Sequence, residues 1–457
     1  MQVVLISTYE LGRQPFGLAS PVAWLRQAGA QVTCLDLAVE SLDHEAICAA
    51  DVVAFYLPMH TATRIATRVV ERVKSSNPRA HLCFYGLYAS MNESLLRKLG
   101  AETILGGEFE AGLVSLVERL RSAPAATKGL PQAEPLVSLA RQQFLVPDRS
   151  GLADLSNYAR LELGNGQSRT VGYTEASRGC KHLCRHCPVV PVYQGQFRIV
   201  QREVVLEDIR AQVEAGAEHI TFGDPDFFNG VGHSLAIVHT LHETFPRLTY
   251  DVTMKIEHLV KHAAHLKTLK ETGCLFVTSA VESVDDDVLV FLDKGHTRED
   301  FIEVVRRCRE AGLALNPTFV AFTPWISVEG YQDLLTVLAE LDLIDHVAPI
   351  QLAIRLLIPA GSRLLELPEV RRMVGPFDET ALVFPWRHPD PQVDQLQADI
   401  QALVEACAAR EEGRREIFSQ VWLLAEQASD GSIRPLPAAA QARPRVTIPY
   451  LTEPWYC

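Results

Sequence analysis

Short β-branched and apolar runs alternate with helical patterns in two separate series along the chain. In the first series, helical patterns such as residues 19–27, 60–73 and 109–120 separate the candidate strands. These candidate strands are residues 2–7, 31–37, 51–57, 81–85 and 103–105. Strands that alternate with helices are typical of βαβ units and a parallel sheet. Residues 1–122 are therefore predicted to form an α/β, doubly wound Rossmann-like domain.

The second series occupies residues 170–362, after a segment in which the periodicity fails. In that segment, residues 123–169, Ala, Pro, Gly and Gln accumulate, and it is predicted to be a linker. The candidate strands of the second series are residues 170–175, 219–223, 250–255, 275–280, 315–322 and 350–358. Six strands with intervening helices predict a partial (β/α)6 barrel, with its chemistry at the carboxyl ends of the strands.

The remaining residues, 363–457, are predicted to be a mostly helical C-terminal region. Helical patterns are clearest at residues 393–409 and 414–427, and a Pro-rich stretch, residues 435–449, leads to the last residues. The total length of 457 residues agrees with several domains, because one hydrophobic core seldom grows to that size.

Charge and hydropathy exclude some classes of partner. The formal net charge is -13, and no basic run is present, so a nucleic acid is not an expected partner. No apolar stretch is long enough for a membrane span, and the first residues lack the basic start of a signal peptide, so we expect a cytoplasmic protein without a membrane partner. Thiols stay reduced in the cytoplasm, and the ten cysteines are therefore not predicted to form a disulfide framework.

Three of the cysteines are clustered in the sequence Cys180-Lys-His-Leu-Cys184-Arg-His-Cys187, directly after the first candidate strand of the second series. Three thiolates on one short loop can hold three irons of a [4Fe-4S] cluster and leave the fourth iron open. Zinc is the alternative, with His182 or His186 as the fourth ligand. Structural zinc sites usually combine two ligand pairs that lie far apart in the sequence, and a second pair is missing here.

The chain resembles the radical SAM superfamily through this CxxxCxxC loop, and the resemblance extends over residues 170–362. It implies a [4Fe-4S] cluster and S-adenosylmethionine (SAM) as cofactors, with the amino and carboxylate groups of SAM on the open iron. His186 stands where the family usually has an aromatic residue. That position shields the cluster and need not ligate it.

The resemblance further implies contacts with SAM at successive strand ends. Gly223 and Asp224 follow the second strand, where the family contacts the methionine amino group, and Asp224 is the expected acceptor. Glu282 and Ser283 end the fourth strand and would face the ribose and carboxylate of SAM. A Gly-Asp-Pro sequence is also common in turns, and a buried Ser or Glu often serves only as a structural hydrogen-bonding group.

Two more residues complete this series. Asn316 lies on the fifth candidate strand and Arg355 on the sixth, where adenine and carboxylate contacts are common in the family. Each match has a structural alternative when it is taken alone. Their order, at the ends of successive strands, is what favours a SAM site.

The first domain resembles the cobalamin-binding-type domain that precedes many radical SAM barrels. The family signature Asp-x-His-x-x-Gly is absent after the first strand, where the chain has Thr8-Tyr9-Glu10-Leu11-Gly12. Cobalamin is thus a candidate cofactor for which this loop offers no histidine ligand. The alternative is a domain that supports the barrel without a cofactor. His60, after the third strand, is expected at the edge where a nucleotide-like ligand binds, unless it is only a surface residue.

The last residues, Thr452-Glu-Pro-Trp-Tyr-Cys457, resemble the end of the CUAEP/CCAEP-tail radical SAM proteins, which close on a Cys-Cys or Cys-selenocysteine pair. Here the sequence stops after one cysteine, as a selenocysteine codon read as a stop, or a natural truncation, would produce. A soft thiol suits capture of a soft electrophile such as trivalent arsenic. Cys457 is therefore a candidate substrate thiol, and an inert terminus is the alternative.

Together these resemblances imply an enzyme that cleaves SAM reductively and passes a carbon group or radical to a small-molecule substrate. One specific candidate is transfer of the 3-amino-3-carboxypropyl group of SAM to trivalent arsenic, and another is a cobalamin-dependent methyltransferase. A non-enzymatic zinc or iron-sulfur redox-relay protein is the alternative of a different class. An electron donor such as flavodoxin or ferredoxin is the expected partner.

Overall fold

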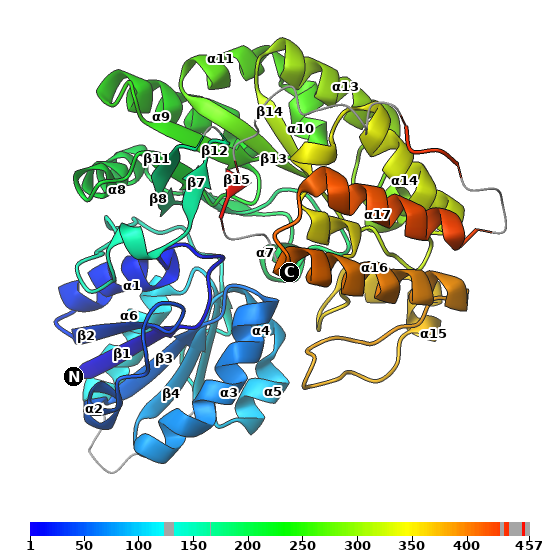
Figure 1. Cartoon of the computed structure of the whole chain (residues 1–457). Helices are drawn as coiled ribbons and strands as arrows, with labels where there is room; N and C mark the ends of the chain where they lie inside the picture. The colour runs from blue at the N-terminus through cyan, green and yellow to red at the C-terminus, as the bar shows by residue number, and fades with distance from the viewer. Residues whose placement is uncertain (123–131, 165, 430–433, 438–449, 453–457) are drawn as a thin grey trace.

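The N-terminal sheet has six parallel strands in the order β2-β1-β3-β4-β5-β6 (Figure 1). The computed structural model describes residues 1–122, 132–164, 166–429, 434–437 and 450–452. The strands of this sheet are β1 (Gln2–Ser7), β2 (Gln31–Asp36), β3 (Val52–Tyr56), β4 (His81–Tyr85), β5 (Thr103–Gly107) and β6 (Val137–Ser138). The helices of this part are α1 (Phe16–Gln27), α2 (His44–Ala49), α3 (His60–Ser76), α4 (Leu87–Met91), α5 (Glu93–Lys98) and α6 (Glu110–Ser122).

Successive side chains of these strands pack into two separate cores, one on each face of the sheet. On β1, Val3 and Leu5 pack into the core that α1 and α6 cover, and Val4 and Ile6 pack into the core that α2, α3 and α5 cover. Both faces of a parallel sheet are buried under helices, so its strands are apolar throughout and not alternating. The predicted doubly wound fold is confirmed.

The second sheet curls into a half-barrel with the order β14-β13-β12-β11-β8-β7-β15. Its five parallel strands are β8 (Ser168–Thr174), β11 (His219–Phe222), β12 (Thr249–Thr253), β13 (Cys274–Glu282) and β14 (Ala314–Phe319). Two antiparallel strands extend one edge, β7 (Arg160–Glu162) and β15 (Tyr450–Leu451). The helices of this part are α8 (Arg202–Glu214), α9 (Val231–Thr244), α10 (Ile256–Lys261), α11 (Leu266–Glu271), α12 (Asp286–Leu292), α13 (Arg298–Glu310) and α14 (Val328–Glu340).

The sixth barrel strand, predicted at residues 350–358, is wrong in extent. Residues Pro349–Leu352 form a 3-10 turn, and the sixth position of the sheet is reduced to one parallel bridge between Phe322 and Arg355. The fixed φ of Pro349 suits the first turn of a helix, so the chain turns where the apolar run predicted a strand. The partial barrel is otherwise confirmed.

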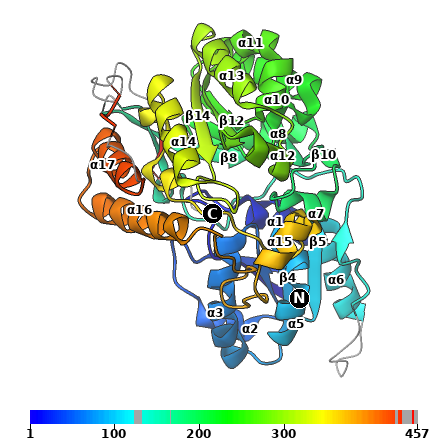
Figure 2. The ribbon, with the colours of Figure 1, turned by 90° about the vertical axis from the view of Figure 1, so that its right-hand side faces the viewer.

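The linker predicted at residues 123–169 also contributes to structure, since β6 extends the first sheet and β7 extends the second. Residues 123–131 and 165 lie outside the described part. In the C-terminal region, helices α15 (Pro368–Met373), α16 (Pro391–Ala409) and α17 (Arg414–Gln427) confirm the predicted helical character. In Figure 2, α16 and α17 lie on the left of both sheets, and their apolar residues complete the barrel core.

Arg178 joins the first domain to the barrel. It lies on β9 (Ser177–Gly179), and its guanidinium is 2.7 Å from Glu110 and 3.3 Å from Glu108 of the first domain. On its own side it is 2.6 Å from Glu175. A buried charge needs partners of this kind to offset its lost hydration, so the ion group favours one arrangement of the two domains.

Candidate functional site

The loop with the three clustered cysteines is fixed at both ends. It leaves β9, which pairs with β10 (Phe197–Ile199), and enters α7 (Val189–Tyr193). Within the loop, the Cys187 N–H donates to the Cys184 carbonyl at 3.2 Å, and the Arg185 guanidinium donates to the Val290 and Phe291 carbonyls. These bonds hold the loop against α12, and Cys187 lines the same cavity as Gly223 and Glu282, which lie at the ends of β11 and β13.

The donor set fits an iron-sulfur cluster. All nine cysteines in the described part of the chain are free thiols, and Cys180 and Cys184 are buried. Burial raises the pKa of Cys180 to about 11 and that of Cys187 to about 12. Without a metal these thiols therefore stay protonated at neutral pH, and a bound cluster would have to displace their protons.

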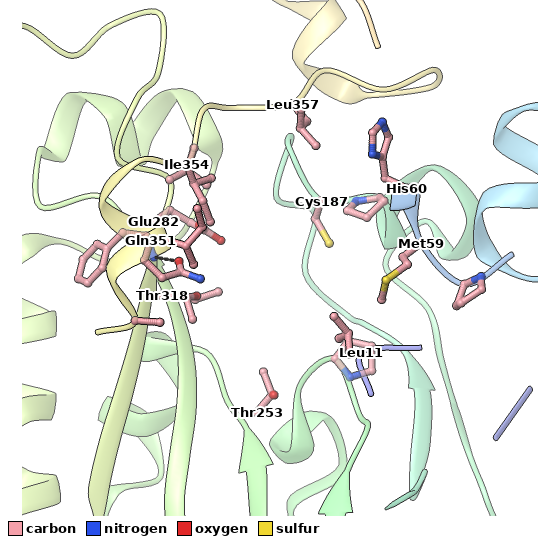
Figure 3. Close-up of a pocket in the computed structure, with 18 of the residues that line it drawn as sticks. Leu11, Met59, His60, Cys187, Thr253, Glu282, Thr318, Gln351, Ile354 and Leu357 are labelled. Atoms are coloured by element: carbon pink, nitrogen blue, oxygen red, sulfur yellow. Dashed lines mark hydrogen bonds between the residues drawn. The ribbon is translucent and has the colours of Figure 1, made fainter. Parts of the chain in front are cut away.

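A cavity of about 1530 Å³ lies between the barrel, the first domain and the C-terminal helices. Figure 3 shows Leu11, Met59 and His60 of the first domain on one side and Glu282, Thr318 and Gln351 on the other, with the Cys187 sulfur pointing into the space. Pockets for one small ligand usually measure about 300–1,000 Å³. This cavity therefore has room for more than one.

Gly223 and Asp224 both line this cavity, at the end of β11. A Cβ on Gly223 would lie 1.8 Å from the Tyr173 hydroxyl, so only glycine fits there. Asp224 is buried, and its carboxylate accepts from the Ala176 N–H at 2.9 Å and from the Ser177 hydroxyl at 2.6 Å. Burial raises the pKa of Asp224 to about 7. Asp224 thus fixes the segment that leads into the cysteine loop, and contact with the SAM amino group stays a prediction.

Glu282, at the end of β13, lines the cavity and is held there by the side chains of His186 and Lys294. Its Oε1 lies 3.1 Å from His186 Nε2 and 3.5 Å from Lys294 Nζ. Burial alone would raise its pKa, but Lys294 and His186 outweigh that effect and lower the pKa to about 2. Glu282 also has a φ of 71°, a strained value for a residue with a side chain. His186 and Lys294 were not predicted as partners of Glu282; His186 stands in the cysteine loop, and Lys294 follows the fourth strand by twelve residues.

The other predicted site residues are placed differently. Ser283 does not line the cavity, and its hydroxyl accepts from the Asp285 N–H at 3.1 Å. Asn316 is outside the lining too, with a buried Oδ1 that has no hydrogen-bond partner in the described structure. Arg355 lines the cavity but is bound to Asp394 at 2.7 Å and stacks on the Trp386 ring at 3.5 Å. Their SAM contacts remain predictions.

The first domain meets the cavity where its strand order reverses between β1 and β3. Ligands of open α/β sheets bind at this switch point, beyond the carboxyl ends of the strands. Glu10, in the loop after β1, lines the cavity, is 6% exposed, and has an Oε2 without a hydrogen-bond partner among the described residues. Burial, with the nearby Glu175 carboxylate, raises its pKa well above the usual range.

His60 lies at the predicted edge and lines the cavity, and its Nε2 is 2.7 Å from the Ala381 carbonyl oxygen. The loop after β1 holds no histidine. The wall at the switch point combines apolar side chains such as Leu11 and Met59 with the free Oε2 of Glu10, and this composition fits a large, partly polar cofactor such as cobalamin. It offers no imidazole from the β1 loop to the metal of that cofactor.

Cys457 lies outside the described residues. Strand β15, which ends at Leu451, pairs with β7, and Tyr450 lines the cavity. The Thr452 N–H donates to the Arg160 carbonyl at 2.9 Å. The chain is therefore anchored beside the cavity five residues before Cys457.

Residues 174–339 match the family model described as Radical SAM superfamily. The hopanoid C-3 methylase of Methylococcus capsulatus is 25% identical over 328 residues, which are 68% of this chain and 62% of that protein. The tRNA-2-methylthio-N(6)-dimethylallyladenosine synthase of Desulfosudis oleivorans is 28% identical over 220 residues, 46% of this chain and 45% of that one. The chain thus spans less than two thirds of the length of these relatives.

Two solved structures resemble the chain over most of its length. One is the cobalamin-dependent SAM radical enzyme OxsB with aqua-cobalamin and SAM bound, with a TM-score of 0.73 and 14% identity over 93% of this chain and 71% of that one. The other is the radical SAM methyltransferase TsrM from Kitasatospora setae, with a TM-score of 0.66 and 17% identity over 88% and 89% of the two chains. At such identities the likeness concerns the fold.

These findings confirm the predicted resemblance to the radical SAM superfamily, whose members are enzymes that use a [4Fe-4S] cluster and SAM. Within the described ranges no helix is both long and apolar enough to cross a membrane. Residues 174–339 therefore form a radical SAM domain, in a chain that has the fold of the cobalamin-dependent radical SAM enzymes.

Proposed function

We propose that this chain cleaves SAM reductively at a [4Fe-4S] cluster held by Cys180, Cys184 and Cys187, and that it transfers a SAM-derived carbon group to a small molecule with the help of cobalamin. One observation carries the proposal: a single cavity joins the Cys187 thiol to the strand ends of the first domain. Two cofactors and an acceptor need such a shared space, because group transfer requires reacting atoms within about 3–3.5 Å of each other.

On the barrel side, the chain's own residues would bind and orient SAM. Gly223 keeps the end of β11 open, because a side chain there would collide with Tyr173. Glu282 stays ionised, since Lys294 and His186 hold its pKa near 2, and it can accept hydrogen bonds from ribose hydroxyls at neutral pH. A cluster held by Cys180, Cys184 and Cys187 would supply the single electron needed to break a carbon–sulfur bond of SAM.

On the first-domain side, the switch-point loops would bind cobalamin, which supplies a metal centre able to carry a methyl group. Met59 and Leu11 offer apolar contact, and Glu10 offers a buried carboxyl group whose pKa is raised by burial, which favours its protonated form. A protonated carboxyl can donate one hydrogen bond to an amide oxygen. No protein imidazole is expected on the metal from the β1 loop.

The third wall of the cavity would receive the acceptor substrate. It consists of residues 348–359 with side chains from α16 and α17, among them Ile354, Val404 and Ile417. Gln351, Gln397 and Gln401 add amide groups to this apolar surface. The same wall also carries the charged side chains of Glu405, Glu412 and Arg414, so it favours an acceptor that combines apolar surface with polar or charged groups.

Product analysis tests the proposal. The cluster-loaded protein is incubated without oxygen with dithionite and SAM labelled in its methyl group, with and without cobalamin. Methyl transfer leaves S-adenosylhomocysteine, whereas formation of the adenosyl radical leaves 5'-deoxyadenosine. Both 5'-deoxyadenosine from the reductive cleavage and a cobalamin-dependent release of S-adenosylhomocysteine are expected. Equal products with and without cobalamin would contradict the role given to that cofactor.

A second candidate is transfer of the 3-amino-3-carboxypropyl group to trivalent arsenic. The observation that favours it is the anchoring of β15, which brings the chain to the cavity five residues before Cys457. Five extended residues reach at most about 18 Å. In the same assay with arsenite added, this reaction would release 5'-methylthioadenosine, and absence of that product would count against it.

A further inference from the structure

A second group of side chains that could ligate a metal includes part of the cysteine loop and lies outside the lining of the large cavity. It contains Cys180 and His182 of the loop, Asp226 after β11 and His258 of α10. Two of its atoms, Asp226 Oδ2 and His258 Nδ1, are buried and have no hydrogen-bond partner within the described structure. Asp226 is 0% exposed and His258 is 1% exposed.

Such atoms are uncommon, because an unpaired buried polar atom costs about 1–3 kcal/mol. Asp226 Oδ2 and His258 Nδ1 lie 2.7 Å apart and form an ion pair when His258 is protonated, although their orientation gives no hydrogen bond. The same carboxylate oxygen is 3.6 Å from His182 Nε2. Asp226 Oδ2, His258 Nδ1 and His182 Nε2 thus converge on one small volume, and two of the three lack a hydrogen bond to any described residue.

The ligand atoms of Cys180, His182 and Asp226 all lie within 4.8 Å of one another. A sulfur, an imidazole nitrogen and a carboxylate oxygen are the three ligand types that zinc accepts. Bond lengths of about 2.0–2.3 Å place tetrahedral ligands about 3.3–3.8 Å apart, so these side chains need only a small closing movement to hold the ion. Calcium and magnesium prefer oxygen alone, so they do not suit this set.

Neighbouring groups already orient these ligands. Asp226 Oδ1 accepts from the Phe228 N–H at 3.1 Å, which leaves Oδ2 for another partner. On the histidine side, His182 Nδ1 lies 3.4 Å from a Glu257 oxygen, and His182 Nε2 lies 3.3 Å from His258 Nε2. A ligating histidine commonly uses its other nitrogen to contact a carboxylate in this way.

We propose that Cys180, His182 and Asp226 bind one zinc-type divalent cation when the cluster is absent, and that this cation and the cluster exclude each other because both need the Cys180 thiolate. Binding releases the Cys180 proton to solvent, since only the thiolate is a ligand. His258 is a positioning residue beside Asp226. The proposal does not depend on which SAM reaction the chain performs.

The test uses the full chain freed of iron, with zinc alone or cobalt(II) alone as the probe. Binding is measured in competition with a chromogenic chelator, and the cobalt form is examined for sulfur-to-metal charge transfer. Wild type is expected to bind one equivalent with that band. His182→Gln and Asp226→Asn should weaken binding at least about tenfold.

Two control variants separate this site from a zinc site made of the three cysteines. His186→Gln alters the other histidine of the loop, which contacts Glu282 instead, and Cys187→Ala removes a cluster ligand that is not part of the set. Both should bind zinc as wild type does. If either weakens zinc as much as Asp226→Asn does, or if wild type binds no zinc, the proposal is overturned.

Cluster assembly supplies a second readout. One equivalent of zinc added before iron and sulfide should block assembly in wild type, and His182→Gln and Asp226→Asn should relieve the block. A variant that assembles the wild-type iron content without zinc is folded. Asparagine is chosen at position 226 because Asp226→Asn keeps the oxygen that accepts from the Phe228 N–H. Equal zinc inhibition in wild type and both variants would refute the shared use of Cys180.

Discussion

Replacement of Glu282 by Gln should destabilise the end of β13, because it leaves the Lys294 ammonium buried without a counter-charge. The side chains of Glu282 and Lys294 are 9% and 3% exposed and 3.5 Å apart. Lowering the Glu282 pKa from 4.5 to about 2 corresponds to about 3 kcal/mol of stability, at about 1.4 kcal/mol per pKa unit. Loss of one partner of a buried pair typically costs about 3–5 kcal/mol.

The assay is native-state amide hydrogen exchange of a peptide that covers Cys274–Glu282, because a chain with several domains does not unfold in two states. At pH 7, Glu282→Gln should lower the opening free energy by about 3 kcal/mol. Lys294→Met should lower the opening free energy by a similar amount. The double variant should lose clearly less than the sum of the two single losses, because it leaves neither charge buried without its partner.

The pH dependence has a defined sign. Because the folded-state pKa of Glu282 is depressed, its stabilisation is complete above pH 4.5 and disappears as the pH falls from 4.5 towards 2. The difference between wild type and Glu282→Gln should shrink over that range. Glu303→Gln is the control, since this carboxylate pairs with Arg306 and Arg307 on the surface and should leave β13 protection almost unchanged. Unchanged protection in Glu282→Gln at pH 7, or fully additive losses, would refute the reasoning.

Three further predictions concern the cofactor sites and the tail. Cys180→Ala, Cys184→Ala and Cys187→Ala should each lose the reconstituted cluster, as measured by iron content, whereas His186→Ala should retain it; full iron in a cysteine variant would contradict the ligand set. Gly223→Ala should weaken SAM binding at least about tenfold in equilibrium dialysis, because overpacking against Tyr173 costs about 1–3 kcal/mol, and an unchanged affinity would exclude this strand end as a SAM contact. Cys457→Ser should reduce the mass adduct with trivalent arsenic while cluster content stays the same, and equal adducts would show the thiol to be a bystander.

The sequence predicted the layers of the fold because buried parallel strands remain as apolar runs. Strands β1, β3 and β4 are buried at almost every position, and helices with one apolar face separate them. The cysteine loop was equally visible, since its three ligands are close in the sequence. Local patterns of this kind need no knowledge of tertiary contacts.

Features that depend on distant contacts were not predictable. Arg355 was expected at a SAM contact, but its partner is Asp394, 39 residues further along the chain. The convergence of Asp226 and His258 on the cysteine loop likewise depends on how β11 and α10 are placed in the barrel. Periodicity reports which residues are buried, and it does not report which buried polar groups meet.

Cys180, Cys184 and Cys187 are proposed to hold a cluster whose open iron binds SAM beside the shared cavity. Electron paramagnetic resonance of the dithionite-reduced protein, recorded with and without SAM, tests this ligand set and the SAM contact together. We predict about four irons and four sulfides per chain, and a cluster signal that SAM shifts in wild type and that is lost in Cys187→Ala. A wild-type signal that SAM leaves unchanged, or an unaltered signal in Cys187→Ala, would contradict the account.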